Sequence, residues 1–299
     1  RRRAVKQGVS DRIQARLCGP DHLGLSEPVD FALSFAVAHE VPDAKSFFLQ
    51  IAAVLKPGGS LLLAEPKLPV SEEQFRALVE EAVAAGYHRV KMKVKRGQDV
   101  DWVRAVRERF PELPLMVDAN GDYTLDDADH LARLDEFGLT MIEQPLSYSD
   151  IYQHSLLQRR LATPLCLDES IQSVRLGRDA IDDGACRIIN IKPGRLGGYA
   201  ESTRLHDLCA SRGVPVWHGG MLESGIGRAH NLHLSSLANF SLPGDVAASR
   251  RYYEPDLIDP PIEVAADGTI PVPDGPGIGV HVVEERVDRA TIRRLEIQR

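Results

Sequence analysis

Hydrophobic and polar positions alternate in a regular way along this chain from residue 88 onward. Short apolar runs predict buried strands, and the segments between them have apolar positions every three or four residues, which predicts amphipathic helices. The predicted strands are 88–94, 113–117, 140–142, 164–167, 186–191 and 214–217. Helices are predicted at 100–110, before Pro111, and at 124–137, before Gly138. About seven such units fit before residue 250, and their alternation predicts an α/β fold with a parallel sheet and outer helices.

Five charged residues follow successive predicted strands at nearly equal spacing. They are Lys93, Asp118, Glu143, Asp168 and Lys192, about 25 residues apart. A strand, a helix and two loops take about that many residues in a barrel of eight units over ~250 residues. In such barrels the catalytic groups come from the C-terminal ends of several strands. The spacing therefore predicts a TIM-like (β/α)8 barrel with one functional side chain per strand at its mouth.

The three acidic residues of this series predict a metal site. Neighbouring parallel strands lie ~4.8 Å apart, so Asp118, Glu143 and Asp168 could converge on one ion. Carboxylate oxygens suit Mg²⁺ (or Mn²⁺), which keeps positions open for water or substrate. A metal that holds a substrate carboxylate stabilises the enediolate formed when an α-proton leaves. We expect Lys93 and Lys192, on either side of the acids, to act as the acid/base pair.

Each of these residues also has a purely structural interpretation. Asp118 could shape a turn, Asp168 could cap a helix, and Glu143 could stand at the entry to a solvated loop. Singly, the structural interpretation is favoured, but coincidence does not readily place three acids and two lysines at strand ends with one period. Lys91 points to the same face as Lys93 and is a weaker catalytic candidate. Asn120 and Asn190 are candidate oxygen-binding groups.

The first part of the chain has a different pattern. Val29 to Val37 reads as a buried strand, Asp43 to Leu55 as a helix, and Ser60 to Glu65 as a second strand, with a turn at Lys56-Pro57-Gly58-Gly59 between the last two. A further helix begins at a capping-box pattern at Ser71 and ends before Gly86.

Composition narrows the class of partner. A net charge of −7 and a sequence pI near 5.8 leave no broad basic field for nucleic acid or an anionic membrane. No apolar run approaches the ~20 residues that span a bilayer, so we expect a cytoplasmic protein. The cysteines are scattered, without the close pairs of a zinc or redox motif.

Six motifs in order identify a family resemblance. They are Lys91-Met92-Lys93, Asp118-Ala119-Asn120, Glu143-Gln144-Pro145, Asp168-Glu169-Ser170, Ile191-Lys192-Pro193-Gly194-Arg195 and Gly219-Gly220-Met221-Leu222-Glu223. From about residue 87 to the C-terminus the chain resembles the enolase superfamily. The most similar members are the o-succinylbenzoate synthases and N-succinylamino acid (N-acylamino acid) racemases of its muconate-lactonising branch.

The resemblance implies roles for these residues. Asp118, Glu143 and Asp168 would hold Mg²⁺, Lys93 and Lys192 would be the acid/base pair, and Gly219, Gly220, Met221 and Glu223 would line the pocket of a small carboxylate substrate, with Lys91, Asn120 and Asn190 as further substrate contacts. In a synthase of menaquinone biosynthesis, Lys93 would remove the α-proton and the enediolate would lose water, while Lys192 stays cationic. In a racemase both lysines would exchange protons with opposite faces. The sequence does not separate the two reactions.

Residues 25–86 resemble another family, the class I methyltransferases that use S-adenosylmethionine. Their Gly-rich cofactor loop after the first strand is absent, so we expect no cofactor site and rank methyltransferase activity last. We therefore predict a Rossmann-like methyltransferase fragment at 1–70 and a barrel with its C-terminal tail at 71–299, without the usual capping domain.

The fusion raises two further expectations. We hypothesise that the strand Leu61 to Glu65 pairs with 88–94 as the missing first barrel strand. The tail at 267–280 would lack its usual partner, and its exposed apolar surface would favour a homo-oligomer. A catalytically silent hybrid that only binds metal is the alternative to an active enzyme.

Overall fold

The computed structural model describes residues 29–35, 49–50, 52–53, 55–64, 79–80, 89–265 and 267–292. The chain divides into two compact units, Arg1–Gln74 and Phe75–Arg299. No helix among the described residues is both long and apolar enough to cross a bilayer.

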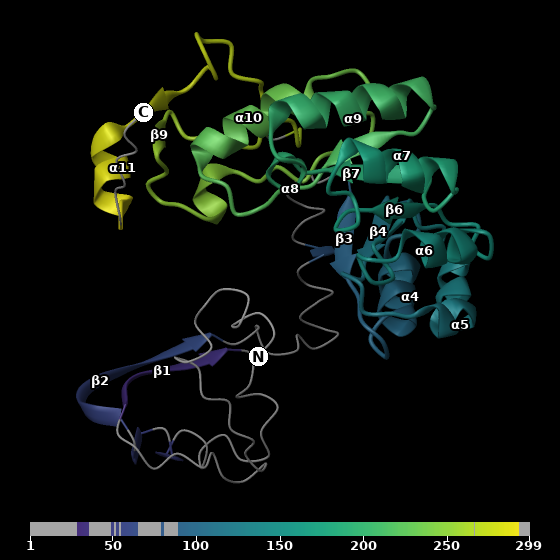
Figure 1. Ribbon diagram of the computed structural model, residues 1–299, viewed down its shortest axis with the longest axis horizontal. Helices are drawn as coiled ribbons and strands as arrows, with labels where there is room; N and C mark the ends of the chain where they lie inside the picture. Colours follow the sequence, from purple (N-terminus) through teal and green to yellow (C-terminus); the bar gives the residue numbers. More distant parts are fainter. Residues whose placement is uncertain are drawn as a thin grey trace. The chain divides into compact units, whose positions relative to one another are not determined.

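The first unit contains a pair of parallel strands, β1 (Val29–Phe35) and β2 (Leu55–Ala64) (Figure 1). The register runs from Phe31 opposite Ser60 to Phe35 opposite Ala64, but Val29 lies opposite Leu55. Residues 56–59 therefore form a bulge inside β2, which corrects the predicted turn; two glycines there let the backbone depart from the ladder without a side-chain clash.

The hypothesis that Leu61 to Glu65 replaces the first barrel strand is wrong. β2 pairs with β1, and the sheet that contains residues 90–93 runs from β3 to β8 without it. Leu61 to Ala64 instead find a parallel partner within their own unit, Ala32 to Phe35 of β1.

The other predictions for this region are tested only in part. Of the helix predicted at 43–55, residues 49–50 and 52–53 are helical, while Leu55 belongs to β2. Residues 79–80 of the helix predicted from Ser71 are helical as well. The remainders of both helices, and residues 36–37 and 65 of the predicted strands, lie outside the described residues.

The second unit is built on six parallel strands that follow one another in chain order. They are β3 (Val90–Lys93), β4 (Leu115–Asp118), β5 (Ile142–Glu143), β6 (Leu165–Leu167), β7 (Ile188–Ile191) and β8 (Val216–His218). Each predicted strand is present, though shorter than its apolar run, and six strands take the place of the seven or so expected. This order is that of a barrel wall, and no pairing joins β8 to β3 within the described part of the chain.

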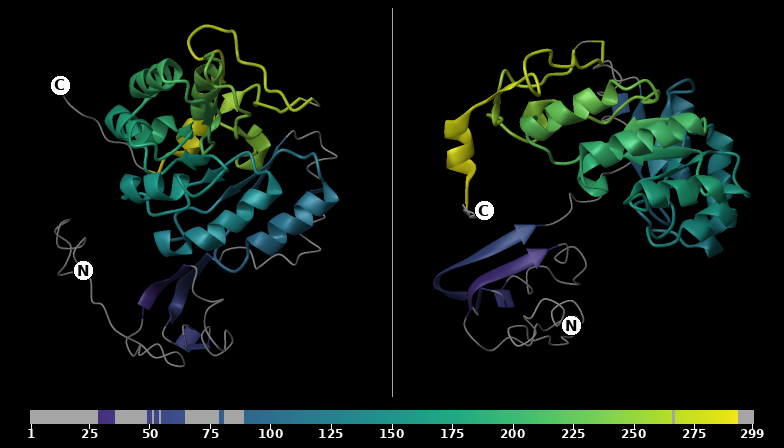
Figure 2. Two further views of the ribbon diagram at one scale, coloured as in Figure 1. Left: turned by 90° about the vertical axis from the view of Figure 1, so that its right-hand side faces the viewer. Right: turned by 45° about the horizontal axis from the view of Figure 1, so that its top comes forward.

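Helices connect successive strands, and several lie along the outside of the sheet (Figures 1 and 2). They are α4 (Val100–Arg109), α5 (Ala128–Ala132), α6 (Ile151–Gln158), α7 (Val174–Asp182), α8 (Pro193–Leu196), α9 (Tyr199–Ser211) and α10 (Gly225–Ser235). Two N-caps follow the expected chemistry: the Asp150 carboxylate accepts from the Gln153 amide, and the Ser173 hydroxyl accepts from the Leu176 amide.

The helix predicted at 124–137 is divided into three parts. The 3-10 helix η2 (Leu125–Asp127) precedes α5, and a second 3-10 helix, η3 (Arg133–Phe137), follows it. The Asp127 carboxylate accepts from both the amide and the hydroxyl of Thr124, which tightens the first turn. Gly138 ends the segment in the left-handed conformation, as its position after the helix predicts.

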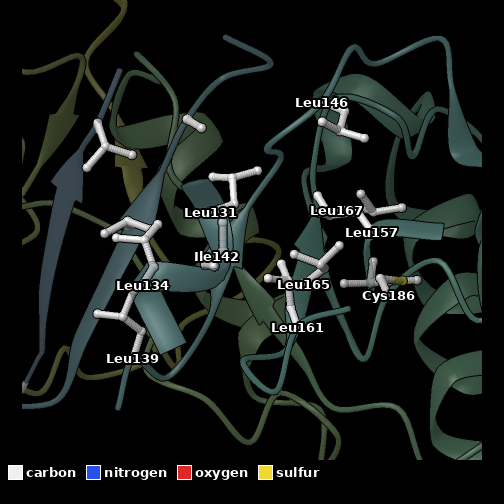
Figure 3. Packing of buried hydrophobic residues seen from close by; sticks show 14 of the residues in the cluster. Leu131, Leu134, Leu139, Ile142, Leu146, Leu157, Leu161, Leu165, Leu167 and Cys186 are labelled. Carbon is white, nitrogen blue, oxygen red and sulfur yellow. The ribbon is translucent and has the colours of Figure 1, made fainter. Parts of the chain in front are cut away.

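Most of the core lies between the sheet and its helices. Figure 3 shows this layer where α5, η3 and α6 meet β5 and β6. Its buried side chains there include Leu131, Leu134, Ile142, Leu157, Leu161, Leu165 and Leu167. The strand residues among them, Ile142, Leu165 and Leu167, lie on the face that looks toward the helices, so alternate strand residues are left to face the barrel interior.

The C-terminal segment adds a short antiparallel pair and a helix. β9 (Ile258–Asp259) pairs with β10 (His281–Val282), and α11 (Glu284–Ala290) follows. Ile270, Ile278 and Val280 of the tail pack against a cluster that includes Ala229 and Leu232 of α10. These tail residues thus pack on the apolar surface of α10 and β9, while the expectation that the tail lacks the capping domain as its usual partner stays a prediction.

Candidate active site

The barrel interior is layered. Its lower layer is apolar and takes one residue from, or next to, each of five strands: Met116, Met141, Cys166, Ile188 and Trp217. Two residues further along each strand the side chain points to the same face. These next positions are Asp118, Glu143, Asp168, Asn190 and Gly219. An acidic layer therefore lies directly above a small apolar plug.

Strand register brings the first members of the predicted series together. Lys93 is the register partner of Asp118, and Asp118 is the register partner of Glu143. The Asp118 and Glu143 side chains are almost fully buried, as is Asp168 just after β6. Burial of three carboxylates within one layer is costly unless cations compensate them.

Lysines supply that compensation within the described residues. Lys91 Nζ lies 2.9 Å from Asp118 Oδ2 and 2.8 Å from Glu143 Oε2, between the two acids. Lys93 Nζ donates to the same Asp118 oxygen at 2.6 Å. Lys192 Nζ donates to Asp168 Oδ2 at 2.7 Å. The predicted acid/base pair thus contacts opposite ends of the carboxylate row, with Lys91 between them.

The two outer lysines differ in their surroundings. The Lys93 side chain is 63% exposed, whereas that of Lys192 is 12% exposed. The closeness of Gly219 explains part of this difference, because a Cβ there would lie 2.5 Å from Lys192 Cε. Only a glycine leaves room for Lys192 in this position.

The two candidate asparagines bind neighbouring side chains of the site. Asn120 Oδ1 accepts from Lys93 at 2.6 Å, and its Nδ2 donates to Glu169 Oε1 at 2.9 Å. Asn190 Nδ2 donates to Glu143 Oε1 at 2.8 Å, and its Oδ1 accepts from the Gly219 amide at 2.7 Å. Asn120 therefore orients a lysine, and Asn190 orients an acid.

The electrostatics of the layer favour an added cation. Burial, together with the nearby Asp118 and Asp168, raises the pKa of Glu143 to about 7 against the opposing effect of Lys91. Burial also raises the pKa of Asp168, against Lys192. Burial acts on Asp118 too, but Lys91 and Lys93 outweigh it and lower its pKa. The Lys91 pKa is raised, because Glu143 and Asp118 outweigh its own burial.

The donor chemistry fits a hard divalent cation. Glu143 Oε2 and Asp168 Oδ1 are buried and lie 2.8 Å from Lys91 Nζ and 3.5 Å from Arg195 Nη1, respectively. In the described ranges, no three acidic, His or Cys side chains are drawn together as a formed metal site. Buried carboxylate oxygens gathered in one layer are the ligands that Mg²⁺ or Mn²⁺ prefers.

The segment predicted to line the substrate pocket is divided in the structure. Met221 and Glu223 line a surface pocket of about 660 Å³, whereas Gly219 and Gly220 do not. Its remaining wall comes from α8, the start of α9, and α10: Pro193, Gly194, Gly197, Gly198, Tyr199, Leu222, Gly227, His230 and Asn231. None of the site lysines or carboxylates lines it. The pocket begins one residue beyond Lys192, beside the acidic layer.

Sequence reasoning missed several residues of the site. Arg195 lies near Asp168, and the Arg89 guanidinium lies 4.6 Å from the centroid of the Trp217 ring at the barrel interior. Gln144 is fully buried beside Glu143. Arg89 shares the alternation of Lys91 and Lys93, so the same period could have found it. For Gln144 the signal is its place inside the motif Glu143-Gln144-Pro145.

Two family models match the chain. Residues 74–286 match the model described as enolase C-terminal domain-like. Residues 1–63 match a methyltransferase domain, which agrees with the resemblance found there.

Curated relatives align with the second unit. An o-succinylbenzoate synthase of Geobacillus stearothermophilus is 58% identical over 214 residues, 72% of this chain and 57% of the relative. An N-succinylamino acid racemase of Amycolatopsis sp is 55% identical over 213 residues, 71% of this chain and 57% of the relative. The chain thus spans less than two thirds of the length of these relatives.

Solved structures agree with the family model and with the curated relatives. An enolase superfamily member from Listeria innocua Clip11262 has a TM-score of 0.72 at 41% identity, over 74% of this chain and 60% of that one. The parallel sheet, the motif order and the family match over residues 74–286 lead to one conclusion: the chain belongs to the enolase superfamily, of which it carries the C-terminal barrel domain.

Proposed function

We propose that this chain removes the α-proton of a small carboxylate substrate, with Mg²⁺, through an enediolate. The two candidate reactions are the dehydration of an o-succinylbenzoate synthase and the racemisation of an N-succinylamino acid. The observation that carries the proposal is the contact of Lys93 and Lys192 with opposite ends of a buried carboxylate row. The 58% and 55% identity to relatives with those two activities supports it.

The lysines perform the proton transfers in this proposal. Lys93, exposed at the mouth and oriented by Asn120, takes the α-proton as general base. Lys192 either stays cationic beside the developing negative charge, as dehydration needs, or returns a proton to the opposite face, as racemisation needs. Asn190 fixes the rotamer of Glu143. Asp118, Glu143 and Asp168 would hold Mg²⁺, which supplies Lewis-acid stabilisation of the substrate's carboxylate charge.

Deuterium exchange tests the proposal. The chain is incubated in D2O with an N-succinylamino acid, and the loss of the α-proton signal is followed by NMR. We expect Mg²⁺-dependent exchange that falls at least ~10³-fold in Lys93→Ala and in Lys192→Ala, because each removes an acid/base group. Lys95→Ala, an exposed lysine after β3, is the matched control. Exchange that survives both substitutions or EDTA would refute the assignment.

Optical rotation and o-succinylbenzoate formation then separate racemase from synthase. The second candidate is a catalytically silent hybrid that binds metal without turnover, and two observations favour it. Lys91 stands between two proposed metal ligands, and the chain spans only part of the length of its relatives. A protein that binds Mn²⁺ but gives no exchange at any substrate concentration would be the silent hybrid. Binding of S-adenosylmethionine would favour a methyltransferase instead.

A further inference from the structure

Gln144 is the most connected polar side chain next to the acidic layer. It follows Glu143 directly, is fully buried, and has a left-handed backbone with φ of 39°. That conformation is uncommon for a residue with a side chain and is kept only when its surroundings favour it. The contacts of Gln144 show what favours it.

The Gln144 side chain binds the segment that follows β6. Its Oε1 accepts from the amide of Asp168 at 3.0 Å and from the amide of Ser170 at 3.2 Å. Its Nε2 donates to Ser170 Oγ at 2.8 Å and to the carbonyl of Leu146 at 3.1 Å. The Gln144 side-chain amide therefore fixes the backbone of Asp168 itself, whose Cα carries the side chain with the carboxylate.

The Gln144 backbone binds the segments on both sides. Its carbonyl accepts from the Gly121 amide at 2.8 Å, in the loop that follows Asp118. Its amide donates to the Cys166 carbonyl at 2.8 Å on β6. One residue thus contacts the chain next to each of the three acids: Asp118 through Gly121, Glu143 by direct bonding, and Asp168 through its amide.

We propose that Gln144 is the positioning residue of the metal site, holding the three carboxylate-bearing strand ends at one spacing. The inference rests on the proposed function, because it assigns Asp118, Glu143 and Asp168 as ligands. Partners of metal ligands that set ligand orientation typically change metal affinity 10–100-fold when they are replaced. Gln144 touches no reacting atom, so its effect reaches the chemistry only through these acids.

Gln158 provides a matched control in the same chain. It is also a buried glutamine whose Oε1 accepts from a β6 amide, that of Leu165, at 2.7 Å. Its Nε2 donates to the carbonyls of Leu161 and Thr163. Gln158 therefore fixes the N-terminal end of β6, and Gln144 the C-terminal end. In parallel barrels the C-terminal face carries function and the N-terminal face carries stability.

The experiment compares the full chain with Gln144→Met and Gln158→Met, which keep volume and remove the amide. Mn²⁺ affinity is measured by calorimetry, and backbone amide exchange by mass spectrometry without metal. We expect Gln144→Met to weaken Mn²⁺ binding about 10–100-fold and to speed exchange in residues 168–171, whose amides at Asp168 and Ser170 bind the Gln144 side chain. Gln158→Met should keep the Mn²⁺ affinity within about twofold and speed exchange near residues 161–165, although both variants lose thermal stability.

Two results would overturn the proposal: unchanged exchange at 168–171 in Gln144→Met, or equal losses of Mn²⁺ affinity in both variants. If the unsubstituted chain binds no Mn²⁺, the proposed function fails, and the exchange data still decide whether the Gln144 side chain holds the segment that begins at Asp168. Gln144→Glu adds a third measurement. It keeps the acceptor for the Asp168 amide and loses the donor to Ser170, so partial recovery of Mn²⁺ affinity is expected relative to Gln144→Met.

Discussion

At the scale of single residues, the most informative group is the Glu143 carboxyl. It is fully buried, bonded to Asn190, and its pKa is raised to about 7 by burial and by two neighbouring acids. A folded-state pKa above the unfolded value means that the stability this group contributes is complete below pH ~4.5 and is lost as the pH rises through about 7. Without metal, the buried Glu143 carboxylate therefore lowers the stability of the fold at neutral pH, and a bound cation would offset this loss.

Replacement of this carboxyl tests that cost. Glu143→Gln keeps an acceptor for Asn190 and removes the charge. Without metal at pH 8, we expect the variant to be more stable than the unsubstituted chain by about 1–3 kcal/mol, and nearly equal to it at pH 5. Urea denaturation in EDTA at both pH values measures the difference. Glu112→Gln, on the exposed surface, is the control, and a gain that is the same at pH 5 and pH 8 would contradict the explanation.

At the scale of elements, two adjacent glycines after β8 leave room for different groups. A Cβ at Gly219 would lie 2.4 Å from Asn190 Nδ2 and 2.5 Å from Lys192 Cε, which are side-chain atoms. A Cβ at Gly220 would lie 2.0 Å from the Asp245 carbonyl oxygen, which belongs to the backbone. The first clash displaces functional groups, and the second displaces a chain segment.

The two alanine variants should therefore fail in different ways. We expect Gly219→Ala to lose at least ~10-fold in α-proton exchange with a small change in melting temperature, because Lys192 is pushed from its position. Gly220→Ala should lose about 1–3 kcal/mol of stability, since overpacking against backbone is poorly relieved. Thermal melts beside exchange rates distinguish them. Gly194→Ala, where a Cβ meets nothing within 4 Å, is the control, and equal melting temperatures for Gly219→Ala and Gly220→Ala would disprove the division.

The elements also show where sequence reasoning succeeds. The strands β3 to β8 were predictable because apolar runs and Gly or Pro signals are local, and because parallel strand ends necessarily meet at one barrel mouth. Thus Asp118 and Glu143 were placed correctly as neighbours, and register confirms it.

The predictions that failed concerned contacts between residues distant in sequence. The bulge at 56–59 and the pairing of β2 with β1 depend on the register between two strands about 25 residues apart, which no local pattern records. The position of Lys91 between two acids depends on side-chain packing, and so do the hydrogen bonds of Gln144. A period of two places these residues on a face but does not say which atoms they contact.

At the scale of the whole molecule, the barrel mouth is unequally covered. The carboxylates are buried, but the Lys93 side chain is 63% exposed and Leu222 after β8 is 70% exposed. A general base in open water loses the strengthened electrostatics of a closed site, and a substrate there is less well oriented. Metal binding depends on the buried acidic layer and should not need closure of the barrel mouth. Turnover should need that closure.

This difference predicts the effect of the part of the relatives that this chain does not match. We expect the N-terminal portion of the Geobacillus stearothermophilus synthase, added in trans or fused, to raise kcat/KM at least ~10-fold while it leaves the Mn²⁺ affinity within about twofold. Lys93→Ala with the same addition should show no gain, because closure cannot replace the base. If the addition instead strengthens Mn²⁺ binding and leaves kcat/KM unchanged, then the acidic layer, and not the exposed lysine, is the incomplete part of the site.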